Sequence, residues 1–113
     1  MAETISVYMT AGSEAEAHRV ASALIEARLA ACVNVLGAVQ SVFYWDGVER
    51  EGEVALIAKA CRADFEALRQ KVRAVHSYDC PCIVAWPIVE GDGEFTDWIE
   101  QETRGQRDAE GGG

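Results

Sequence analysis

The chain has 113 residues, half of them apolar, and carries 19 acidic against 10 basic side chains. A chain of this length builds one compact core and is too short for two, so a single domain is expected. The net charge of −9 disfavours nucleic acid and anionic membrane surfaces as partners and makes cations the more plausible ligands.

The N-terminal part predicts a strand followed by a helix. Apolar and polar side chains alternate over Ile5–Met9, a period of two that is typical of a strand with one buried face. Ser13 and Glu16 then form a capping-box pattern, which marks the start of a helix. The apolar residues behind it keep helical spacing: Ala17, Val20, Ala21, Leu24, Ile25 and Leu29.

The middle of the chain predicts a long β-hairpin. Residues Cys32–Trp45 are rich in β-branched and aromatic side chains, and Asp46-Gly47 follows, a dipeptide that tolerates the positive φ of a tight turn. Val54–Cys61 is predicted as the returning strand. The polar residues 49–53 between them are expected to project into solvent.

The next part predicts a second helix and a last strand. Apolar residues three and four apart define one helical face that ends near His76, namely Phe65, Leu68, Val72 and Val75. Residues Cys82–Val89 are nearly all apolar and predict a covered strand, in which Pro87 must lie where no backbone donor is needed.

A short third helix is predicted around Phe95, Trp98 and Ile99, the one apolar face that can hold it down. We expect Trp98 to be largely buried, against its own sheet or a neighbouring subunit. The sequence therefore divides into one domain, residues 1–103, and a disordered tail, residues 104–113, that lacks core-forming side chains.

The element order βαββαβ plus a terminal helix predicts an α+β fold, a ferredoxin-like sandwich of a four-stranded antiparallel sheet and two helices. Two activities known on this topology are disfavoured. The strands lack the aromatic motif of an RNA-recognition domain, and TAGSE replaces the arginine-bearing phosphate loop of an acylphosphatase.

Three stretches carry a resemblance to a known family: LAACVNVLGAVQSVFYWDG, VHSYD with Pro81 just beyond it, and DWIE. In order and separation they resemble the CutA divalent-cation tolerance proteins over roughly residues 4 to 103. The resemblance implies a PII-like homotrimer with a role in tolerance of copper or other divalent metals and without enzymatic activity. The long apolar hairpin independently predicts strand pairing between subunits.

The resemblance also implies a metal site made of Met9, His76 and Cys82. His76 stands where the family has a histidine, Cys82 where it commonly has a glutamate, and Met9 where some members have a cysteine. A thioether, an imidazole and a thiol favour soft ions, so copper as Cu(I) is the expected ligand and zinc the alternative. Cys80 is expected to be a reserve thiol, that is, an alternative ligand beside this site.

Other interpretations of the same residues stay open. His76 can simply complement the end of a helix, and Cys80-Pro81-Cys82 lacks the second cysteine pair of a zinc motif. The alternative function is a PII-like trimeric regulator or scaffold that binds a small ligand or partner protein in clefts between subunits. No export signal or membrane span is apparent, so a cytoplasmic protein with reduced thiols is expected.

Overall fold

Four strands form one antiparallel sheet in the order β2-β3-β1-β4. The computed structural model describes residues 3–110, and the side chains of residues 3–103. The strands are β1 (Thr4–Ala11), β2 (Cys32–Tyr44), β3 (Val48–Cys61) and β4 (Ile83–Pro87). This strand order, with the helices described next, confirms the predicted ferredoxin-like α+β fold.

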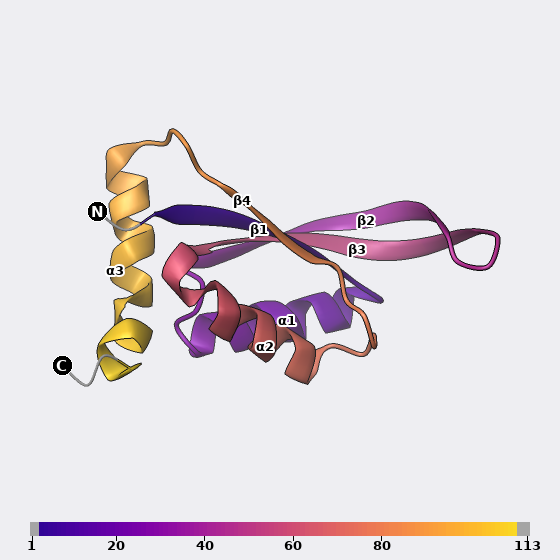
Figure 1. The fold of residues 1–113 in the computed structure, drawn as a ribbon, viewed down its shortest axis with the longest axis horizontal. Coiled ribbons are helices and arrows are strands. Elements are labelled where there is room, and N and C mark those ends of the chain that lie inside the picture. The colour runs from indigo at the N-terminus through magenta and orange to yellow at the C-terminus, as the bar shows by residue number, and fades with distance from the viewer. Residues whose placement is uncertain (1–2, 111–113) are drawn as a thin grey trace.

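Two helices cover one face of the sheet, α1 (Glu14–Glu26) and α2 (Phe65–Val75), the second preceded by the turn η1 (Arg62–Asp64) (Figure 1). The core lies between the helices and the sheet because the apolar faces of both layers meet there. Its fully buried side chains include Met9, Leu24, Leu56, Leu68 and Val72.

The β2–β3 hairpin is longer than the rest of the sheet and extends beyond it (Figure 1). Asp46 and Gly47 at its tip both have positive φ, 55° and 121°, as the dipeptide predicts. The returning strand was predicted to begin at Val54, which is too late: β3 starts at Val48 and includes the polar residues 49–53. Those residues pair with β2 while their side chains stay exposed or half-buried.

The last strand is shorter than predicted. β4 covers Ile83–Pro87, so Cys82 lies just outside it and the predicted extension to Val89 is wrong. β4 is an edge strand that pairs only with β1 in this sheet. Pro87 ends it, and an edge position tolerates the missing backbone donor.

Helix α3 (Gly93–Glu110) stands at the end of the sheet opposite the hairpin tip (Figure 1). Ile99 is fully buried, but Trp98 is 37% exposed, so its predicted burial against its own sheet is wrong for the single chain. The helix is also held by a contact of 3.4 Å between the Cys61 Sγ and the Thr103 Oγ1, both buried. The Arg28 guanidinium donates to the Glu102 carbonyl oxygen at 2.5 Å.

The predicted tail at residues 104–113 stays a prediction. Its backbone continues α3 to Glu110, while residues 111–113 lie outside the described residues. Within residues 3–110, no helix has the length and apolar character needed to cross a bilayer.

Candidate functional site

The thiol loop, defined here as residues 76–82, connects the end of α2 to β4. Helix α2 ends at Val75, and the amide of His76 still donates to the Val72 carbonyl at 2.9 Å. At the other end of the loop, Ile83 pairs with Met9 of β1. The loop therefore lies beside the C-terminal end of β1, where the chain turns into α1.

Glu16 of α1 joins this loop to the turn before α1. Its side chain is almost fully buried, with 3% of the residue exposed. One carboxylate oxygen accepts from the Gly12 amide at 2.8 Å, and the other accepts from the Ser77 amide at 2.8 Å. Burial opposes ionisation of the carboxylate, but the hydrogen bonds from Ser77 and Gly12 and the nearby His76 outweigh it and lower the pKa of Glu16 to about 2.

His76 uses both of its ring nitrogens in hydrogen bonds to the backbone. Nε2 lies 2.7 Å from the carbonyl oxygen of Thr10, and the Tyr78 amide donates to Nδ1 at 3.1 Å. A carbonyl can only accept and an amide N–H can only donate, so the partners define the neutral tautomer with its hydrogen on Nε2. The Nε2 bond to a carbonyl resembles the orientation of metal-bound histidines, but the Nδ1 lone pair that a metal needs is occupied by Tyr78.

Tyr78 fixes the loop to the hairpin. Its hydroxyl donates to Glu53 of β3 at 3.1 Å, and the other oxygen of Glu53 accepts from the Ser41 hydroxyl of β2. Burial, the Glu53 hydrogen bond and the surrounding carboxylates raise the pKa of Tyr78 to about 12, so it remains a donor at neutral pH. The Tyr78 ring also packs edge-to-face on His76, with centroids 4.7 Å apart.

The predicted metal ligands occupy three different environments. Met9 is 0% exposed and lies in the core, whereas Cys82 is exposed and free. Partial burial and the charge of Glu53 raise the pKa of the Cys82 thiol. Among the described residues, no group of three or more His, Cys, Asp or Glu side chains is arranged to hold a metal ion. The set Met9, His76 and Cys82 therefore stays a prediction, and it requires Met9 to become accessible and His76 to release the Tyr78 amide.

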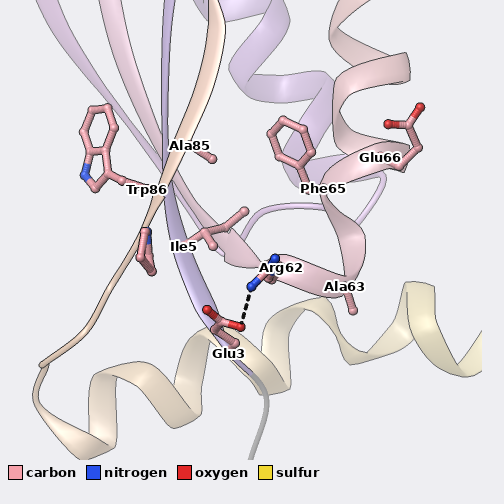
Figure 2. Close-up of a pocket in the computed structure, with 9 residues that line it drawn as sticks. Glu3, Ile5, Arg62, Ala63, Phe65, Glu66, Ala85 and Trp86 are labelled. Carbon is pink, nitrogen blue, oxygen red and sulfur yellow. Dashed lines mark hydrogen bonds and ion pairs between the residues drawn. The ribbon is translucent and has the colours of Figure 1, made fainter.

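A cavity of about 480 Å³ opens at the other end of β1, between β4 and the start of α2. Apolar side chains such as Ile5, Phe65 and Pro87 line it, and an ion pair of 3.1 Å between Arg62 and Glu3 lies at one side (Figure 2). Its volume and apolar lining are in the range of small-molecule sites. The cavity is separate from the thiol loop because the two lie at opposite ends of β1.

Sequence reasoning missed two residues that organise this region. Glu16 was identified through the capping box, but its bond to Ser77 bridges 61 positions and carries no local signal. Glu53 was one of several polar residues in a stretch expected to be solvated. His18, in contrast, lies exposed on α1 beside Glu14.

Comparisons with known proteins place these features in a family context. The model of the family described as CutA1 divalent ion tolerance protein matches residues 5–102. The divalent-cation tolerance protein CutA of Archaeoglobus fulgidus is 46% identical over 96 residues, covering 84% of this chain and 93% of the relative. The protein of the same name from Thermus thermophilus is 42% identical over 98 residues, covering 86% of this chain and 95% of the relative.

Solved structures agree in fold. The periplasmic divalent cation tolerance protein CutA from Archaeoglobus fulgidus superimposes with a TM-score of 0.86 at 44% identity, covering 88% of this chain and 98% of that one. CutA1 from Oryza sativa superimposes with a TM-score of 0.89 at 36% identity, covering 91% of this chain and 95% of that one.

Proposed function

The chain belongs to the CutA1 divalent ion tolerance family, and from that premise we propose that it is a non-enzymatic protein that binds cations and contributes to tolerance of them. The observation that carries the proposal is the family match, which spans residues 5–102 and so includes the four strands except Thr4, together with the thiol loop. The net charge of −9 supports a cationic ligand because it lowers the free energy of a cation near the surface.

Copper is the proposed ion, held as Cu(I), with zinc as the alternative. Support comes from the exposed thiol of Cys82, since soft sulfur ligands favour Cu(I) over calcium, magnesium or manganese. The predicted ligand set of Met9, His76 and Cys82 belongs to this proposal. Cytoplasmic residence is likewise a prediction, and it would keep the thiols reduced.

An anaerobic titration of the reduced protein with Cu(I) and Zn(II) tests the binding function, with stoichiometry counted per chain. One tightly bound ion per chain is expected. A copper-sensitive bacterial strain that expresses the protein should also grow at higher copper concentrations than the same strain carrying an empty vector. Failure of the protein to bind either ion would contradict the proposal.

We also propose that the protein assembles as a homotrimer through its hairpin. Large apolar side chains lie exposed on the distal half of the hairpin, including Trp45 at 74%. The others are Val42, Phe43, Tyr44 and Val48. An exposed apolar surface of this kind normally marks an interface, and a closed ring protects strand edges from aggregation.

Sedimentation equilibrium at micromolar concentration should give three times the chain mass. A Val42→Lys, Val48→Lys double variant should shift the mass toward that of the monomer, while a Glu49→Gln, Glu51→Gln variant of the same strand region controls for the same change in net charge. A wild-type monomer would contradict the assembly and leave cation binding untouched.

The cavity lined by Ile5 and Phe65 favours a second candidate function, a PII-like regulator or scaffold that binds a small ligand. Its mixture of apolar walls and one ion pair suits a ligand with an apolar body and a charged end. This function takes precedence if the protein forms trimers but binds no cation.

A further inference from the structure

The two exposed thiols lie two positions apart in sequence. Cys80 and Cys82 are free and exposed, separated only by Pro81, whereas Cys61 is buried and Cys32 is half-buried in β2. The four cysteines therefore separate into two that are accessible together in the thiol loop and two that belong to strands.

The backbone that carries these thiols is fixed on both sides. Before Cys80, the Ser77 amide is bonded to Glu16, the Tyr78 hydroxyl to Glu53, and the Asp79 carbonyl accepts from Arg73 of α2 at 3.0 Å. After Cys82, the chain enters β4 and pairs with β1. A site on a backbone held in this way loses little conformational entropy when it binds a ligand.

The spacing of the thiols allows both to reach one ion. Pro81 fixes its own φ near about −65° and keeps the residue before it out of the helical region. Two residues separated by one other have Cα atoms at most about 7 Å apart. Two cysteine side chains on such a segment can bring both sulfurs to a single ion.

The number of available ligands selects the ion. Zinc in a structural site takes four protein ligands in a tetrahedron. Among the described residues, no third His, Cys, Asp or Glu combines with the two thiols to form a metal-binding group. Cu(I) is soft, prefers thiolate and is stable with two sulfur ligands in a linear arrangement. A pair of thiols without further ligands is therefore matched to Cu(I) and poorly matched to zinc.

We propose that Cys80 and Cys82 form a two-thiolate site for Cu(I). This inference rests on the proposed cation-binding function and names the ligands of the ion. Cys80 takes the place of His76 and Met9 as a ligand, because His76 is hydrogen-bonded to the backbone and Met9 is buried in the core. Binding releases two protons, one from each thiol, forms two Cu–S bonds and changes no oxidation state. The carboxylate of Glu53 near Cys82 adds negative charge that favours the incoming cation.

The first experiment titrates the reduced protein with Cu(I) against a chromophoric Cu(I) chelator under anaerobic conditions. Wild type should bind one Cu(I) per chain. Cys80→Ser and Cys82→Ser should each weaken binding at least tenfold, because a single thiolate remains. Cys32→Ser is the matched control, since it removes a thiol outside the loop and should change the affinity less than twofold.

The second experiment is X-ray absorption spectroscopy of the wild-type copper complex, which needs no variant to fold. Two sulfur neighbours without nitrogen are expected. A nitrogen neighbour, or loss of affinity in His76→Ala as large as in Cys80→Ser, would overturn the inference in favour of the set Met9, His76 and Cys82.

The outcomes separate this inference from the function on which it rests. If wild type binds Cu(I) and Cys80→Ser binds it equally well, the inference fails and the proposed function stands. If wild type binds neither Cu(I) nor Zn(II), both fail. Zn(II) bound more tightly than Cu(I) would overturn the assignment of the ion.

Discussion

The two halves of the thiol loop use their polar groups in opposite ways. In the first half, the His76 Nε2, the Ser77 amide and the Tyr78 hydroxyl bond to partners on β1, α1 and β3. The Tyr78 amide also donates to the His76 Nδ1 within the loop. In the second half, Cys80 and Cys82 leave their thiols exposed and free. The hydrogen bonds of His76 thus help to hold the first half of the loop in place, whereas the accessible thiols lie in the second half.

Among the variants that test this comparison, Glu16→Gln should cause the largest loss of stability. An amide in place of the carboxylate sets an N–H group against either the Gly12 or the Ser77 amide, both of which donate. Hydrogen bonds to charged groups are worth about 1.5–3 kcal/mol each, so we expect a loss of about 3 kcal/mol at pH 7. Urea unfolding measures it, and Glu14→Gln on the exposed side of the same helix is the control.

The same carboxylate makes stability depend on pH. Its folded pKa of about 2 lies below the value of about 4.3 in an unfolded chain, so the unfolded state binds a proton first as pH falls. Its contribution is complete above about pH 5 and is lost as pH falls toward 2. Wild type should lose stability over this range more steeply than Glu16→Gln, and equal slopes would contradict the assigned pKa.

His76→Ala should cost about 2 kcal/mol, because it leaves the Thr10 carbonyl and the Tyr78 amide without their ring partners. His18→Ala is the matched control on an exposed face and should change stability by less than about 0.5 kcal/mol. Hydrogen exchange provides a second measurement. The Tyr78 amide should be protected in wild type and exchange faster in His76→Ala.

Tyr78→Phe should have a smaller effect, about 1 kcal/mol, because the ring keeps its packing on His76 and only the bond to Glu53 is lost. Glu53 retains the Ser41 hydroxyl as a donor, which limits the cost. Tyr44→Phe at the exposed hairpin controls for removal of a hydroxyl. Equal stability of the two variants would mean that the loop is held without the bond from the Tyr78 hydroxyl to Glu53.

The sequence predicted the elements because their signals are local. Alternation defined β1, the capping box defined the start of α1, and the apolar spacing ended α2 near His76, next to its last residue Val75. The predicted turn at the hairpin tip was also correct, because Asp46 and Gly47 tolerate the positive φ that this turn requires. The start of β3 was wrong because a polar stretch was taken for a loop, although strand pairing needs only backbone groups.

The features that the sequence did not reveal depend on contacts distant in sequence. The partner of His76 Nε2 lies 66 positions away at Thr10, and nothing near His76 indicates that carbonyl. The apolar spacing on α3 was real, yet Ile99 is buried and Trp98 is 37% exposed. The contact between Cys61 and Thr103 is one of those that hold α3 against the sheet, and an amphipathic pattern does not predict it.

Cys80→Ser and Cys82→Ser should have the smallest effects on stability, within about 0.5 kcal/mol of wild type, because exposed thiols make little packing. Cys61→Ser is the contrasting control. It places a hydroxyl in a fully buried site beside Thr103 and should cost more than about 1 kcal/mol.

Thiol labelling makes the same comparison without any substitution. A maleimide should modify Cys80 and Cys82 in the native protein because both are exposed, and reach Cys61 only after unfolding. Cys82 should react more slowly than an unperturbed thiol because its raised pKa leaves less thiolate. Pre-incubation with one equivalent of Cu(I) should protect both exposed thiols together, since each is a ligand of the same ion. Protection of Cys82 alone would indicate that His76 or Met9, and not Cys80, is its partner ligand. The two halves of the loop would then be less distinct than their hydrogen bonds indicate.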